Sequence, residues 1–166
     1  MQIPTLALLL ALSFNVHAAG GHNHGVGKLD VSVDGEQLTL ELELPLDSAV
    51  GFERAPKNDK ERAALADAER LLKDAATLFV PTPAAACTID SVAVEMPHAG
   101  KPSESHEHAD IDARYVFRCA NPAMLKSVET ALFKHFKRLY RIEARRATPA
   151  SQGSARLSAK QAVMTW

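Results

Sequence analysis

The chain has 166 residues, of which 19 are Lys or Arg and 20 are Asp or Glu, so that its formal net charge is −1. This balance gives no indication of nucleic-acid binding, and a hydrophobic content of 46% is typical of a folded protein and not of a disordered one. The length suits one domain, for which roughly 100–200 residues is usual.

The first 18 residues predict a secretory signal peptide. They contain no Lys, Arg, Asp or Glu, and the apolar run Leu6–Phe14 is followed by Val16-His17-Ala18, an A-x-A-like cleavage site. The run is shorter than the roughly 20 residues that span a bilayer, so cleavage is favoured over anchoring. We therefore predict export to the periplasm, with no membrane insertion after the signal is removed.

A flexible, His-containing N-terminal segment is expected at residues 19–25, followed by a single domain over residues 26–166. The domain opens with a β-hairpin, because Leu29–Val33 and Leu38–Leu44 alternate between apolar and polar residues on either side of the turn signal Asp34-Gly35. Pro45 ends the second strand.

A helix is predicted next. Asn58 precedes Glu61 by three residues, which is the spacing of a capping box, and Pro81 and Pro83 end the element. Its apolar stripe consists of Leu65, Ala68, Leu72, Ala75 and Phe79.

The second half of the chain predicts a similar series. Strands are expected at Ile89–Met96, with a bulge near its start, and at Ile111–Cys119, joined by the polar loop Pro97–Ala109. Asn121-Pro122 predicts the start of a second helix. The apolar stripe of this helix would be Leu125, Val128, Leu132 and Phe136.

One or two strands are expected near the end of the chain, around Tyr140–Ala144 and Ser154–Leu157. The predicted order is therefore ββα-ββα-β(β). Such an order indicates an α+β fold in which two helices cover one face of a largely antiparallel sheet.

Cys87 and Cys119 are the two cysteines of the chain. In an exported protein an even pair predicts a disulfide, and the alternative is two buried free thiols. A disulfide would join the start of one predicted strand to the end of its hairpin partner. The loop Pro97–Ala109 would then project from the opposite end of that hairpin.

Histidines gather in the two most polar stretches of the exported chain, and these stretches contain two His-x-His pairs. The candidate metal ligands are His22, His24, His98, His106 and His108. Candidate carboxylate ligands beside the second pair are Glu104, Glu107 and Asp110. Zinc binds imidazole nitrogen and carboxylate oxygen in a tetrahedron, so this composition favours zinc. His135 is interpreted instead as a cation near a helix C-terminus.

Several alternatives remain open. Signal cleavage after Ala19 would leave Gly20-Gly21-His22 at the terminus, a chelator of Cu(II) or Ni(II). The histidines would otherwise be solvated loop residues of a module that binds a protein partner without metal. An enzyme is not expected, because the sequence lacks the G-x-S-x-G, H-E-x-x-H and phosphate-loop motifs.

The sequence as a whole resembles the ZrgA family of periplasmic zinc-uptake-associated proteins of Gram-negative bacteria. The segments that carry the resemblance are, in chain order, His22-Asn23-His24-Gly25, Asp34-Gly35, Leu38–Leu44, Val50-Gly51-Phe52-Glu53, Ala55-Pro56, Leu78-Phe79, Cys87, Tyr115–Cys119, Leu132-Phe133, Phe136, Gly153 and Leu157. The family often has His at the position of Arg54, and its His-rich loop is often longer than Pro97–Ala109.

The resemblance implies a periplasmic protein that binds zinc through a His-rich loop and assists zinc import. The implied partners are the zinc ion and a component of a zinc ABC-transport system. The matching positions carried over as zinc ligands are the same five histidines, His22, His24, His98, His106 and His108.

Overall fold

The computed structural model describes residues 24–98 and 109–166. The strands are β1 (Val26–Asp34), β2 (Gln37–Pro45), β3 (Phe79–Pro81), β4 (Cys87–Glu95), β5 (Asp110–Cys119), β6 (Ser127–Thr130), β7 (Arg141–Ala147), β8 (Gln152–Leu157) and β9 (Val163–Thr165). The helices are α1 (Leu46–Val50), α2 (Asp59–Lys73), α3 (Ala75–Leu78) and α4 (Leu132–His135), with the 3-10 helices η1 (Pro83–Ala85) and η2 (Pro122–Met124).

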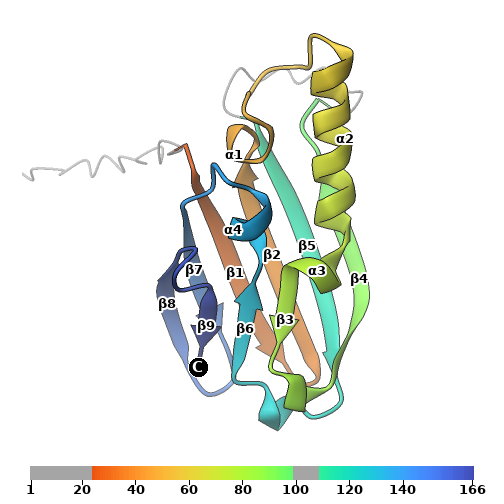
Figure 1. Ribbon diagram of the computed structural model, residues 1–166. Helices are drawn as coiled ribbons and strands as arrows, with labels where there is room; N and C mark the ends of the chain where they lie inside the picture. Colours follow the sequence, from red (N-terminus) through yellow and green to blue (C-terminus); the bar gives the residue numbers. More distant parts are fainter. Residues whose placement is uncertain (1–23, 99–108) are drawn as a thin grey trace, which may run out of the picture.

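Two sheets form the framework. The large sheet has six strands in the order β4-β5-β2-β1-β7-β8, and the small one has three in the order β3-β6-β9. The pair β1–β7 is parallel, whereas the other strand pairs are antiparallel. The small sheet and the helices lie over one face of the large sheet (Figure 1). The fold is therefore α+β, as predicted, with a mixed large sheet.

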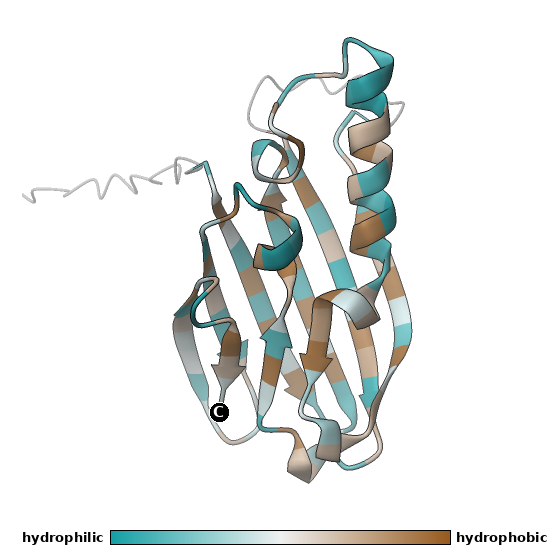
Figure 2. Cartoon of the chain, in the orientation of Figure 1, coloured by the Kyte–Doolittle hydropathy of each residue, from teal (hydrophilic) through white to brown (hydrophobic). Residues whose placement is uncertain are grey.

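The core lies between these two layers. The predicted alternation places one set of side chains of β1, β2, β5 and β7 inward, and Figure 2 shows the corresponding hydrophobic bands crossing the strands. The inward residues of β2 and β5 include Leu38, Leu40, Leu42, Leu44, Ile111, Ala113, Tyr115 and Phe117. Phe79, Val128 and Met164 of the small sheet are buried from the other side. Each layer thus covers the apolar face of the other layer, which would otherwise be exposed to water.

The first predicted helix is confirmed at its start and corrected at its end. The Asn58 side chain accepts a hydrogen bond from the Glu61 N–H at 2.9 Å and caps α2. The helix ends at Lys73, because Asp74 leaves the helical conformation and caps α3 through the Thr77 N–H. Phe79, which was predicted on the helix, begins strand β3 instead.

The second predicted helix is wrong over most of its length. Val128 lies in β6, which pairs with β3 on one side and β9 on the other, and only Leu132–His135 form a helix. All four residues of the predicted stripe are nevertheless buried. The apolar spacing correctly identified the buried residues, but it could not reveal that two distant strands supply backbone partners to Ser127–Thr130.

One end of the large sheet, here called the loop end, gathers segments that are distant in the chain. β1 begins there, and β2 runs directly into α1. The register brings Val26 beside Arg141 and Pro45 beside Asp110, and the Leu46 N–H donates to the Ala109 carbonyl at 2.9 Å. Figure 1 shows α1, the start of β1 and the α4–β7 connection at this end.

Candidate metal centre

The helix α1 presents a carboxylate toward the start of β1. This five-residue helix follows Pro45, buries Leu46 and Ser48, and ends at Gly51, whose φ of +89° suits glycine. Asp47, in its first turn, therefore remains partly exposed next to the chain that enters β1. The segment after the helix then carries Glu53.

His24 lies between these two carboxylates. Its Nδ1 is 2.9 Å from Oδ2 of Asp47 and 3.2 Å from Oε1 of Glu53. The side chains are 69%, 20% and 36% exposed, respectively, so the cluster is open to solvent on the histidine side. One imidazole nitrogen and two carboxylate oxygens within 4.8 Å of one another form a donor set that could hold a metal ion.

A backbone clamp next to His24 holds it in this place. The Gly25 N–H donates to Oγ of the buried Ser48 at 3.0 Å, and the Gly25 carbonyl accepts from the N–H groups of Tyr140 and Arg141 at 3.0 and 3.2 Å. Three hydrogen bonds to one glycine tie the residue after His24 to both α1 and the start of β7. The histidine is therefore positioned by two other regions of the chain, α1 and the start of β7.

An ion pair between Arg54 and Glu61 fixes the segment that carries Glu53. Both terminal nitrogens of Arg54 donate to the Glu61 carboxylate, at 2.7 and 2.9 Å, and the Lys57 N–H donates to the same carboxylate. The hydrogen bond from Arg54 is the largest cause that lowers the pKa of Glu61 to about 2. Arg54 thus anchors the segment that carries Glu53 to α2.

His98 contacts the backbone of Glu53. Its Nε2 is 3.2 Å from the Glu53 carbonyl oxygen, and its φ of +63° places it in the left-handed region. If Nε2 carries the hydrogen and donates, Nδ1 keeps a lone pair for a metal, which is how many metal-binding histidines are oriented. The structure therefore brings one histidine from each predicted cluster into contact with the same residue, Glu53.

The remaining predicted ligands have different outcomes. His22, Glu104, His106, Glu107 and His108 lie outside the described residues. Asp110 begins β5 opposite Pro45 and is not part of the His24 cluster. His135, at the end of α4, is exposed and likewise lies apart from the cluster.

Sequence reasoning did not identify Asp47 and Glu53 as ligands, although a signal for Asp47 was present. The two-residue turn of the first hairpin sets a register in which Lys28 pairs with Glu43. Counting four residues further along each strand, away from the turn, reaches His24 and Asp47. No local pattern relates Glu53 to this pair, because its position depends on the path of the chain after α1.

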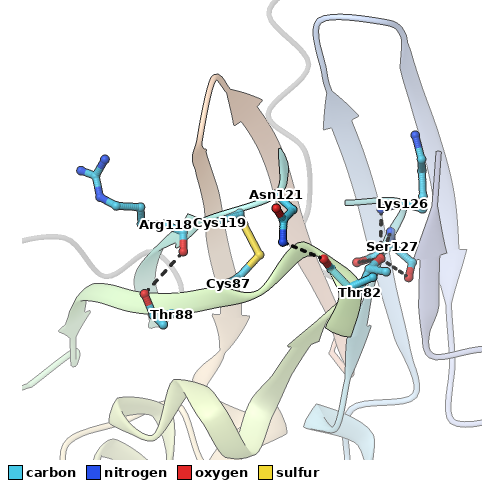
Figure 3. The surroundings of a disulfide bond; sticks show 9 residues. Thr82, Cys87, Thr88, Arg118, Cys119, Asn121, Lys126 and Ser127 are labelled. Atoms are coloured by element: carbon cyan, nitrogen blue, oxygen red, sulfur yellow. Dashed lines mark hydrogen bonds between the residues drawn. A yellow bond between two sulfur atoms is a disulfide. The ribbon is translucent and has the colours of Figure 1, made fainter. Parts of the chain in front are cut away.

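The predicted disulfide is confirmed at the opposite end of the sheet. Cys87 and Cys119 are register partners at the start of β4 and the end of β5 and are joined by an S–S bond (Figure 3). Thr88 and Asn121 beside them bond to the Arg118 and Ala84 carbonyls. The bond suggests an oxidising, extracytoplasmic location, and no helix of the described residues is long and apolar enough to cross a membrane.

Comparison with known families links the chain to zinc uptake. The family model described as "ZrgA family zinc uptake protein" matches residues 21–166, which include the His24 cluster, His98 and both cysteines. The chain belongs to the ZrgA family. No curated protein matches the chain in sequence. Membership in the ZrgA family indicates a role associated with zinc transport and not with catalysis.

For a ZrgA protein, the His24 cluster has a donor set that suits zinc. Zinc–nitrogen and zinc–oxygen bonds of roughly 2.0–2.1 Å place tetrahedral ligand atoms about 3.3 Å apart. The observed separations of 2.9 and 3.2 Å from the imidazole nitrogen to the two carboxylates are close to that value. Small side-chain shifts would therefore be enough to accept an ion.

Proposed function

We propose that this protein captures zinc in the periplasm and passes it to a zinc ABC-transport system. The observation that carries the proposal is the approach of His24 to the Asp47 and Glu53 carboxylates in a chain of the zinc uptake family. These three side chains would supply one nitrogen and two oxygen ligands. A fourth position would stay open to water or to another histidine.

The other predicted histidines complete the proposal. His98, which contacts the Glu53 carbonyl, is a candidate fourth ligand after a side-chain rotation. His22 is two residues before His24. His106 and His108, together with Glu104, Glu107 and Asp110, would contribute from the segment that returns to Ala109, whose carbonyl contacts the first residue of α1.

Exposure of the cluster supports capture and release instead of permanent storage. The His24 side chain is more than two thirds exposed, and a site with three protein ligands leaves one coordination position to a partner. A partner histidine or carboxylate could therefore enter the coordination sphere before the first ligands leave it.

The test is calorimetric titration of zinc into the tag-free protein. His24→Ala, Asp47→Asn and Glu53→Gln should each weaken zinc binding by at least about tenfold, equivalent to about 1.4 kcal/mol. His135→Ala and Asp90→Asn are matched controls, because both residues are exposed and lie outside the cluster. These two variants should bind zinc as the unmodified protein does.

A triple variant tests the contribution of the second histidine group. His98/His106/His108→Ala should weaken binding further when combined with His24→Ala. Unchanged zinc affinity in both His24→Ala and the triple variant would contradict the proposed site. Absence of any zinc binding by the unmodified protein would instead support a module that binds a protein partner without metal.

A further inference from the structure

A basic surface lies beside the His24 cluster on the connection from α4 to β7. Lys134, Lys137 and Arg138 are exposed, and none of them forms an ion pair with another residue in the part of the chain that the structure describes. By contrast, Arg114 and Arg145 on the large sheet are paired with Glu41 and Asp30. We call Lys134, Lys137, Arg138 and Tyr140 together the basic loop.

The basic loop lies next to the metal cluster. A Cβ built on Gly51 would lie 3.1 Å from the Arg138 guanidinium, so Arg138 covers the residue that ends α1. The Gly51 N–H donates to the carbonyl of Asp47 at 2.8 Å. Tyr140 donates its N–H to Gly25, next to His24. Figure 2 shows both hydrophilic and hydrophobic residues in α4, whose Leu132 and Phe133 are buried while Lys134 and His135 are exposed.

Tyr140 gives the basic loop an aromatic centre. Its side chain is 58% exposed, and the Arg141 guanidinium lies 5.9 Å from its ring centroid. Exposed tyrosine and arginine side chains are enriched in protein interfaces, where they supply rigid contact area and charge-assisted hydrogen bonds. Three unpaired cations are fewer than the roughly four to eight of surfaces that bind anionic membranes, which favours a protein partner.

We propose that the basic loop docks an acidic segment of the protein that receives zinc. This inference rests on the proposed function for the identity of that protein, but the charge complementarity of the loop does not depend on zinc. Bound zinc would offset the negative charges of Asp47 and Glu53 next to Arg138. The zinc-loaded protein should therefore attract an acidic segment more strongly than the metal-free protein does.

The test uses a fluorescent peptide of ten alternating Asp and Gly residues, and a control peptide with Asn in place of Asp. Binding is measured by anisotropy at low salt, with the metal-free protein in chelator. The Asp peptide should bind, the Asn peptide should not, and binding should weaken as salt screens the charges. Lys134→Gln/Lys137→Gln/Arg138→Gln should weaken binding by at least about fivefold, because three attractive charges are lost.

The matched control is Lys60→Gln/Lys126→Gln/Lys160→Gln, which removes three exposed lysines elsewhere. It should change binding by less than about twofold, since these charges lie far from one another along the chain. Equal weakening in both triple variants would overturn the assignment of the basic loop. Loop-dependent binding to phosphatidylglycerol vesicles without binding to the Asp peptide would also overturn it, in favour of a membrane surface.

Zinc then separates this inference from the proposed function. Stoichiometric zinc should tighten Asp-peptide binding by the unmodified protein, and His24→Ala should abolish that increase while leaving metal-free binding intact. Loop-dependent binding in chelator, together with no zinc binding in the calorimetric titration, would keep the docking surface and contradict the proposed zinc site. Zinc binding without any peptide binding would contradict the docking surface alone.

Discussion

Gly25 is the position at which the addition of one methyl group should weaken zinc binding while the protein still folds. Its φ is +75°, and a Cβ added there would lie 2.5 Å from two ring carbons of Tyr140 and 2.8 Å from the Arg138 carbonyl oxygen. The exposed Tyr140 ring can rotate away, but the Arg138 carbonyl belongs to the backbone, and a φ of +75° is itself unfavourable for alanine. Gly25→Ala should therefore release residues 24 and 25 from α1 and β7.

The cost of this release follows from the three hydrogen bonds of the clamp. Each bond contributes about 0.5–1.5 kcal/mol, so the loss of all three costs roughly 2–4 kcal/mol. The destabilisation should not exceed this amount, because the segment can detach and so avoid the clash. Since detachment also removes His24 from Asp47, zinc affinity should fall by at least about tenfold, the usual effect of losing a metal ligand's support.

Gly35→Ala is the matched control. Gly35 also has a positive φ, +56°, but a Cβ there meets nothing within 4 Å, so only the backbone cost of about 1–2 kcal/mol applies. Urea denaturation measures stability and calorimetry measures zinc affinity for both variants. Unchanged zinc affinity in Gly25→Ala, or equal zinc affinity losses in the two variants, would refute the clamp.

Three further predictions concern the rest of the molecule. Tyr115→Phe should leave stability unchanged or raise it by up to about 1 kcal/mol in urea denaturation, because its buried hydroxyl has no hydrogen-bond partner among the described residues; a loss above that amount would reveal a hidden partner. Glu61→Gln should lower stability equally at pH 7 and pH 5 and progressively less toward pH 2, because Arg54 lowers the pKa of Glu61 to about 2 from an ordinary 4.5 and the stabilisation disappears only as pH falls through the lower value; a pH-independent difference would contradict this. Reduction of Cys87–Cys119 should cost about 3–4 kcal/mol in the chain-entropy model yet leave zinc affinity unchanged, since the bond lies at the opposite end of the sheet; a parallel loss of zinc affinity would show that the two ends are coupled.

Much of the large sheet could be predicted from local patterns. The alternation in β1, β2 and β5, the turn at Asp34-Gly35 and the bulge after Ile89 are all confirmed, as is the disulfide. Each of these features is set by a strand period of two, by turn chemistry, or by the pairing of two cysteines across one hairpin. Such features depend on residues that are close in sequence or joined by one connection.

The small sheet could not be predicted in the same way. β3 and β9 have three residues each, too few to show a period, and β6 lies between them with partners from two distant segments of the chain. A stripe of apolar residues that suits a helix then also suits a short strand followed by a helical turn. Burial was predictable there, whereas the backbone conformation depended on distant partners.

The candidate site shows the same division. His24 and His98 could be selected by residue type, and both lie beside Glu53 in the structure. Asp47 was reachable from the hairpin register. Glu53 could not be selected in this way. Its side chain is positioned by the left-handed turn at Gly51 and by the Arg54–Glu61 ion pair, and neither feature produces a periodic pattern in the sequence.

The most direct test of the zinc site is a crystal structure of the zinc-loaded protein with anomalous diffraction measured at the zinc edge. The proposed site predicts an anomalous peak at roughly 2.0–2.2 Å from His24 Nδ1 and from a carboxylate oxygen of both Asp47 and Glu53. A zinc peak that contacts none of these three side chains, in a crystal where the His24 cluster is free of lattice contacts, would contradict it.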